Sequence, residues 1–191
     1  MSTIPATRAD GPRSLADRLI APGLFLAWLA NDLEELATMH EDSKDAMRLA
    51  SRVLPIPAAV RERGISQSHI ELGIAMMGGL MLAASADGVR TGGRGRVFQT
   101  ALFGFGIHGF GHLAQAAAMR RWTSGARTSP TVVIPYWLLA SWALRRRGVD
   151  PTERVSWPFV VGMPAFLLAV HGAAWAIRRA MGVRRPLADE E

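Results

Sequence analysis

The chain has 191 residues, 49% of them hydrophobic, and a mean hydropathy of +0.14, which is more apolar than a soluble domain of this size usually is. It contains no cysteine, which excludes disulfides, thiolate zinc sites and cysteine nucleophiles, so any metal must be bound through histidine, carboxylate or carbonyl groups. The formal charge of +6 comes from basic residues in short clusters between apolar segments, as in the loops of membrane proteins, and this pattern argues against nucleic-acid binding.

Five apolar segments follow in chain order, and each is predicted to be a helix. They cover about residues 19–39, 68–86, 97–119, 131–144 and 157–177. Each approaches the ~20 residues that a helix needs to cross a hydrocarbon core of about 30 Å. The fourth is short, and its pattern can be extended upstream through Ser129.

These segments predict an all-α fold, a polytopic membrane protein built as a bundle of about five transmembrane helices. Polar tails at residues 1–18 and 182–191 flank a single transmembrane domain, residues 19–181. Met47, Leu49, Val53 and Leu54 are expected to form a separate short amphipathic helix that Pro55 ends. We therefore expect a multi-pass protein of the cell membrane, surrounded by membrane lipid and in an undetermined oligomeric state.

Ionisable residues are predicted to lie at one depth in this bundle. Helices one, three and five run in the same direction, which places Glu34, Glu35, His108, His112 and His171 at similar heights, and Glu71 reaches the same layer from the second helix. A charge at mid-bilayer costs between ~3 and over 10 kcal/mol, so these groups are expected to face inward and to share protons or a cation. His69, at a helix end, is expected to lie at the surface.

The spacing on two helices supports a common interior site. At 100° per residue, Asn31, Glu34 and Glu35 fall within an arc of about 100° on the first helix. His108 and His112 are four residues apart on the third helix and share one of its faces. The simpler alternatives are hydrogen-bonded packing histidines, acids that reach the membrane interface, and a soluble helical protein.

Three features of the sequence belong together. They are Asn31-x-x-Glu34-Glu35, the stretch HGFGHLAQAAAMRRWTSG, and His171. In combination they resemble the HXXEE family, small membrane proteins named for a His-x-x-Glu-Glu motif, over about residues 24–180. In that family a histidine opens the motif and a later Asn-x-x-x-His precedes a basic-aromatic-small turn. Here Asn31 replaces the first histidine and His108 stands where asparagine is usual, so the resemblance implies architecture more than activity.

The stretch NDLEE also looks like the Asn-Asp-x-x-Asp element by which membrane prenyltransferases bind Mg²⁺ and a diphosphate. This likeness favours a metal-dependent membrane enzyme that acts on an isoprenoid or lipid-like substrate, with terpene synthase or prenyltransferase chemistry as the most specific hypothesis. Carboxylate oxygens suit Mg²⁺, and arginines bind diphosphates. The expected metal ligands are Asn31, Asp32, Glu34, Glu35 and Glu71, the diphosphate-binding residues are Arg120, Arg121 and Arg127, and the candidate bases are His108, His112 and His171.

Two other functions fit the same residues. The carboxylates and histidines can form a mixed site for one or two iron, manganese or zinc ions, as expected of a membrane oxidoreductase or hydrolase. Buried acids and histidines also line transport pathways, so a non-catalytic carrier or a proton- or metal-binding protein is the third hypothesis.

Overall fold

The computed structural model describes residues 15–53, 55, 56 and 58–181, and within these residues every regular element is a helix and there is no strand. Four helices form the body, α1 (Leu15–Ala50), α3 (Gln67–Thr91), α4 (Arg96–Met119) and α5 (Ile134–Arg146). The other elements are α2 (Ala58–Arg63), a π-helical turn η1 (Ser129–Val133), α6 (Trp157–Val161) and α7 (Met163–Ala180). The prediction of an all-α fold is confirmed.

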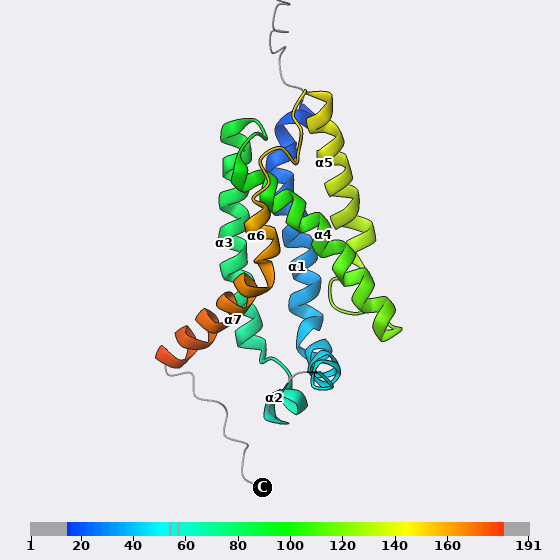
Figure 1. Cartoon of the computed structure of the whole chain (residues 1–191), viewed down its shortest axis with the longest axis vertical. Coiled ribbons are helices and arrows are strands. Elements are labelled where there is room, and N and C mark those ends of the chain that lie inside the picture. The colour runs from blue at the N-terminus through cyan, green and yellow to red at the C-terminus, as the bar shows by residue number, and fades with distance from the viewer. Residues whose placement is uncertain (1–14, 54, 57, 182–191) are drawn as a thin grey trace, which may run out of the picture.

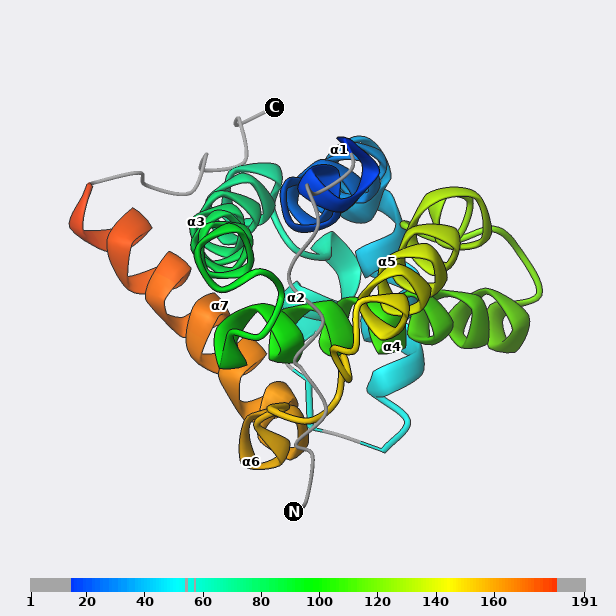
Figure 2. The ribbon, with the colours of Figure 1, turned by 90° about the horizontal axis from the view of Figure 1, so that it is seen from above.

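The long helices enclose one hydrophobic core. Helices α1, α3 and α5 run along the long axis, and α4 crosses them obliquely (Figure 1). Seen from above, α7 points away from the rest of the bundle (Figure 2). The largest fully buried apolar side chains are Leu24, Phe98, Leu102, Val133 and Leu144, from α1, α4, η1 and α5. This core fixes α4 against α1, and that contact positions the site described below.

The first helix is longer than predicted. Helix α1 continues through Ala50, so Met47 and Leu49 belong to its last turns, and the expected separate amphipathic helix is wrong for these residues. Leu54 lies outside the described residues. No proline or glycine interrupts residues 40–50, which allows the helix to continue past the apolar segment.

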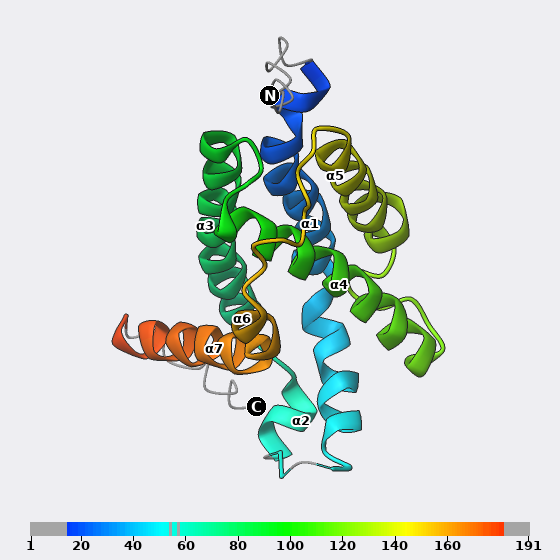
Figure 3. The ribbon, with the colours of Figure 1, turned by 45° about the horizontal axis from the view of Figure 1, so that its top comes forward.

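The fourth and fifth predicted segments differ from single regular helices. The fourth begins at Ser129, as the sequence pattern allowed, but its first five residues form the π turn η1. The fifth is divided at Gly162 into α6 and α7, which lie at an angle to each other (Figure 3). A proline in the first turn of α7 has no amide hydrogen, so it cannot continue the backbone hydrogen bonds of α6. This accounts for the break.

The five membrane spans predicted from the sequence are only partly supported. Among the helices that the structure describes, α3 is the one long and apolar enough, by length and composition, to cross a membrane. This is weak support, since a core helix of a soluble protein passes the same test. The interrupted fifth segment and the 13 residues of α5 leave less continuous apolar helix than the sequence segments implied.

Candidate functional site

Three side chains from α1 and α4 converge on one point. His112 Nε2 lies 2.8 Å from Glu35 Oε1, His108 Nε2 lies 3.3 Å from the same oxygen, and the two Nε2 atoms are 2.7 Å apart. Two ligands of one tetrahedral ion, each ~2.1 Å from it, lie about 3.4 Å apart, so small outward shifts of these side chains would let them share a metal ion. Glu35, His108 and His112 therefore form a group that can hold a metal.

The two histidines are brought together by helix geometry and by a glycine. They are four residues apart and so project from one face of α4. Gly125, in the loop after α4, has φ +72°, and a Cβ at this position would collide with the His112 ring. The loop can close over His112 because residue 125 has no side chain and accepts the left-handed conformation.

Burial differs across the cluster in a way that leaves one side open. Glu35 and His112 are 4% and 8% exposed, whereas 47% of the His108 side chain is accessible. His108 lines the cavity described below, so the cluster opens in that direction. Catalytic metal sites keep such an open position for water or substrate, whereas structural sites are closed.

Asn31 and Glu34 face away from this opening and toward the loop after α4. Asn31 Nδ2 donates to Glu35 Oε1 at 2.6 Å, which orients the Glu35 carboxylate. Glu34 accepts hydrogen bonds from the backbone N–H and the hydroxyl of Thr128, at 2.9 and 2.7 Å. Glu34 therefore anchors the loop to α1, and its carboxylate is already occupied.

Further contacts between α1 and the loop after α4 lie nearer the C-terminal end of α1. Thr38 Oγ1 lies 3.0 Å from Ser124 Oγ, and Asp42 accepts from the Ser124 backbone N–H. Arg121 pairs with Asp42 and with Asp45, the latter at 2.9 Å. The hydrogen bond from Arg121 to Asp42 raises the pKa of Arg121 above its ordinary value, so the guanidinium stays charged and paired with protein carboxylates. Arg120 and Arg127 are exposed.

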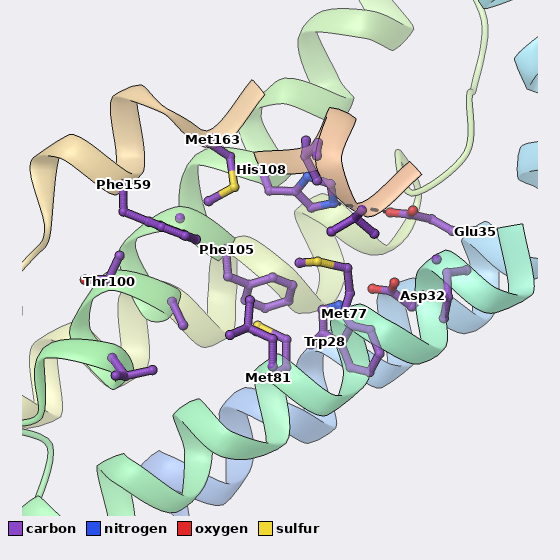
Figure 4. A pocket seen from close by; sticks show the side chains of 18 of the residues that line it. Trp28, Asp32, Glu35, Met77, Met81, Thr100, Phe105, His108, Phe159 and Met163 are labelled. Atoms are coloured by element: carbon purple, nitrogen blue, oxygen red, sulfur yellow. Dashed lines mark hydrogen bonds and ion pairs between the residues drawn. The ribbon is translucent and has the colours of Figure 1, made fainter. Parts of the chain in front are cut away.

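Asp32 lies one turn before Glu35 and faces the interior. It is 6% exposed, it lines the cavity, and its Oδ2 has no hydrogen-bond partner among the described residues. Figure 4 shows its carboxylate beside the Glu35 and His108 end of the cavity. A buried carboxylate oxygen without a partner is costly, so Asp32 is available to a polar group of a ligand.

The cavity beside the cluster has a volume of about 530 Å³ and is lined mainly by apolar side chains. Such volumes are typical of small-molecule sites, which combine apolar walls with a few polar groups. The walls come from α1, α3, α4, α6 and α7, with Trp28, Met77, Phe105, Phe159 and Met163 among them (Figure 4). Asp32, Glu35 and His108 supply the polar groups at one end.

His171 reaches the same cavity but has a different partner from the one expected. Its Nδ1 lies 2.9 Å from His69 Nε2, and the two rings are stacked. His69, expected at the surface without a role, thus connects α3 to α7. Glu71 is exposed and does not line the cavity, although Ile70 and Gly73 beside it do.

The structure therefore brings together a subset of the predicted site residues. Glu35, His108 and His112 form the cluster, and Asp32 lies at the same end of the cavity. Two functional positions were not predicted, Gly125 against His112 and Thr128 against Glu34. The turn-rich composition of residues 123–128 was the available signal, but it did not indicate which face of α1 the turn would contact.

Comparison with known proteins identifies a family. The family model described as "Protein of unknown function with HXXEE motif" matches residues 23–140. This range contains every member of the cluster and the loop that closes over it. No curated protein and no solved structure matches the chain.

Proposed function

The chain belongs to the HXXEE family, and we propose that it is a metal-dependent membrane enzyme whose ion is held by Glu35, His108 and His112. The observation that carries this proposal is the convergence of one carboxylate and two imidazoles at the end of an apolar cavity. In this proposal Asn31 occupies the first position of the family motif, and it orients Glu35 through its amide.

The ligand set favours a transition metal over Mg²⁺. Imidazole suits zinc and iron, whereas Mg²⁺ prefers carboxylates, waters and phosphates. Two histidines and one carboxylate are the ligands of several zinc hydrolases and of non-haem iron oxygenases. An ion bound here would supply Lewis acidity if it is zinc and oxidation chemistry if it is iron.

The protein's own groups have distinct parts in this proposal. The apolar walls would bind and orient a lipid-like substrate and exclude water. Because His108 is accessible from the cavity, an ion bound to it would be open to the substrate there. The unpaired Oδ2 of Asp32 would accept a hydrogen bond from a polar group of the substrate. The buried face of His112 against Gly125 keeps the second imidazole in place.

Diphosphate chemistry with Mg²⁺, our first hypothesis from the sequence, receives less support from the contacts. Thr128 already satisfies Glu34, and Asp42 and Asp45 already neutralise Arg121. Glu71 lies outside the cavity. We therefore rank a histidine–carboxylate enzyme above a prenyltransferase-like one, with a lipid-like substrate in both cases.

Embedding of the bundle in the membrane is part of the same proposal. Large apolar side chains are more than half exposed on several helices, among them Leu26, Leu33, Leu82, Leu139 and Leu168. Large exposed apolar side chains on several helices suit contact with lipid. With the apolar α3, they are the basis on which we propose a multi-pass protein.

The experiment that tests the metal site is elemental analysis of the protein purified in detergent. We expect close to one transition-metal ion per chain, and we expect Glu35→Gln and His112→Ala to weaken its binding by about 100-fold or more, since even second-shell changes cost 10- to 100-fold. Glu34→Gln and His69→Ala are the matched controls and should keep the ion, because neither residue contacts it. A wild-type protein that binds neither zinc, iron nor manganese would contradict the proposal.

A further inference from the structure

The cavity is elongated. Along α1 it is lined from Trp28 to Met39, along α3 from Ile70 to Met81, and along α4 from Arg96 to His108. These stretches advance 11 or 12 residues, which corresponds to about 17 Å at 1.5 Å per residue. A length of this order, with a volume of about 530 Å³ and mainly apolar walls, suits a hydrocarbon chain.

The two ends of the cavity carry different polar groups. Figure 4 shows Asp32, Glu35 and His108 toward one end and Thr100 toward the other. Arg96 and Ser156 also line the cavity: Arg96 lies four residues before Thr100 on α4, and the Ser156 N–H donates to Thr100 Oγ1. Arg96 is exposed, and the ion pairs of the described residues engage Arg48, Arg90 and Arg121 but not Arg96. The Arg96 end therefore offers a cation at the mouth of an apolar tunnel.

The surroundings of Arg96 are also basic. The α5–α6 loop packs on the first turns of α4, since Gln99 Nε2 donates to Asp150 O and the Ser156 N–H donates to Thr100 Oγ1. Residues 87–96 and 145–154, which meet at this end, contain seven arginines and three acids. An anion approaching this end is therefore attracted.

We infer that the cavity takes a single-chain lipid whose anionic head group, carboxylate or phosphate, is bound by Arg96 and whose chain points toward Glu35, His108 and His112. The inference rests on the proposed function in one respect, that the cavity is the substrate site. It adds the substrate class and the orientation, and it places the reacting carbon or bond about 17 Å from the head group. Arg96 is thus a specificity-determining residue.

Binding of three probes that share one chain tests the head group. Oleate, oleyl phosphate and oleyl alcohol are titrated into the full-length protein in detergent, with displacement of a fluorescent fatty acid as the signal. We expect one or both anionic probes to bind at least tenfold more tightly than the alcohol. Arg96→Gln should remove that difference. Arg94→Gln, which changes an exposed arginine that does not line the cavity, should preserve it.

Oleate and oleyl phosphate separate the two sources of negative charge, since an enzyme for lipid phosphates prefers the second. Equal binding of all three probes, or no effect of Arg96→Gln, would overturn the inference. Metal content is measured on the same samples. Wild-type protein without bound metal would count against the metal site. The ratio of the probe affinities would still test the head-group assignment.

Gly104 provides a test of orientation. It lines the cavity eight residues after Arg96, and a Cβ there would meet only Met163 Cε, at 3.6 Å. Gly104→Leu should block the tunnel about 12 Å from Arg96. We expect it to abolish oleate binding but to leave octanoate binding intact and still dependent on Arg96. Octanoate binding that no longer responds to Arg96→Gln would place the head group at the other end. Unchanged metal content and melting temperature would show that the Gly104→Leu protein is folded.

Discussion

The imidazole of His112 lies directly against the Cα of Gly125, and the backbone of Gly125 is left-handed, with φ +72°. This contact joins the loop after α4 to the only buried imidazole of the cluster among the described residues. The glycine is therefore expected to control the position of a metal ligand.

Gly125→Ala should reduce both stability and metal affinity. Left-handed backbone costs a non-glycine residue about 1–3 kcal/mol, and the new methyl group must also displace the His112 ring. Gly148→Ala is the matched control, because Gly148 has φ +68° but open space around its Cβ. Thermal unfolding and metal content measured together should show destabilisation in both variants and metal loss only in Gly125→Ala. Equal metal content in the two would mean that the contact does not position His112.

Thr128→Val should weaken the loop without emptying the site. It removes the hydroxyl that binds Glu34 but keeps the shape and the backbone N–H bond to the same carboxylate. A lost hydrogen bond to a charged group costs about 1.5–3 kcal/mol. We expect a lower melting temperature and an unchanged amount of bound metal. Parallel metal loss would instead make Glu34 a ligand.

Arg121→Ala distinguishes a structural arginine from a diphosphate-binding one. Because Arg121 pairs with Asp42 and Asp45, its loss should destabilise the loop by roughly 1 kcal/mol or less. Affinity for oleyl phosphate should not change, in contrast to Arg96→Gln. A large loss of phosphate binding in Arg121→Ala would restore the diphosphate-binding role that the sequence suggested.

His171→Ala should loosen α7 from α3. The His69–His171 contact and the hydrogen bond from Arg178 to Ser66 are the described polar links between α7 and the start of α3. Removal of the imidazole should increase hydrogen exchange in α7, residues 163–180, and leave α1 and α4 protected. Unchanged exchange in α7 would show that its apolar packing alone holds it.

Single cysteines can test the membrane proposal cleanly, because the chain has none of its own. Leu82 is 56% exposed in the middle of α3, whereas Arg61 lies in the short α2. In intact membranes, a membrane-impermeant maleimide applied to both sides should label Arg61→Cys and spare Leu82→Cys. Detergent should then expose Leu82→Cys as a control for reactivity. Equal labelling before detergent would show that α3 does not cross the membrane.

The helical class could be predicted from sequence because it depends on local periodicity. The four-residue spacing of His108 and His112 also predicted that they share one face of a helix. That Glu35 would lie near His112 was expected for a different reason, since both fall at a similar depth and isolated buried charges are costly. The length of α1 and the break at Gly162 were not predicted, because an apolar pattern marks burial and not the end of a helix. The placement of Glu71 was missed since depth was inferred from segment ends without knowledge of rotation about the helix axis.

Which polar side chains of Asn31–Glu35 face the cavity and which contact the loop could not be predicted from the sequence either. Asp32 and Glu35 face the cavity, while Glu34 faces the loop. Asp32, Glu34 and Glu35 all carry carboxylates, so residue type does not distinguish them. Which carboxylate binds a loop and which faces a cavity depends on the path of residues 120–128, and a turn-rich segment permits many paths.

The contacts between α1 and the loop after α4 also bear on how the chain is made. They join residues 76 to 97 positions apart, from Arg121–Asp45 to Thr128–Asn31. Helix α1 is synthesised before α4, so its acidic side chains have no partners until the loop after α4 has been made. Contacts of such long sequence separation form late and slowly. During synthesis, the carboxylates of α1 therefore remain without these partners. The contacts around the site are complete only when residue 128 has left the ribosome.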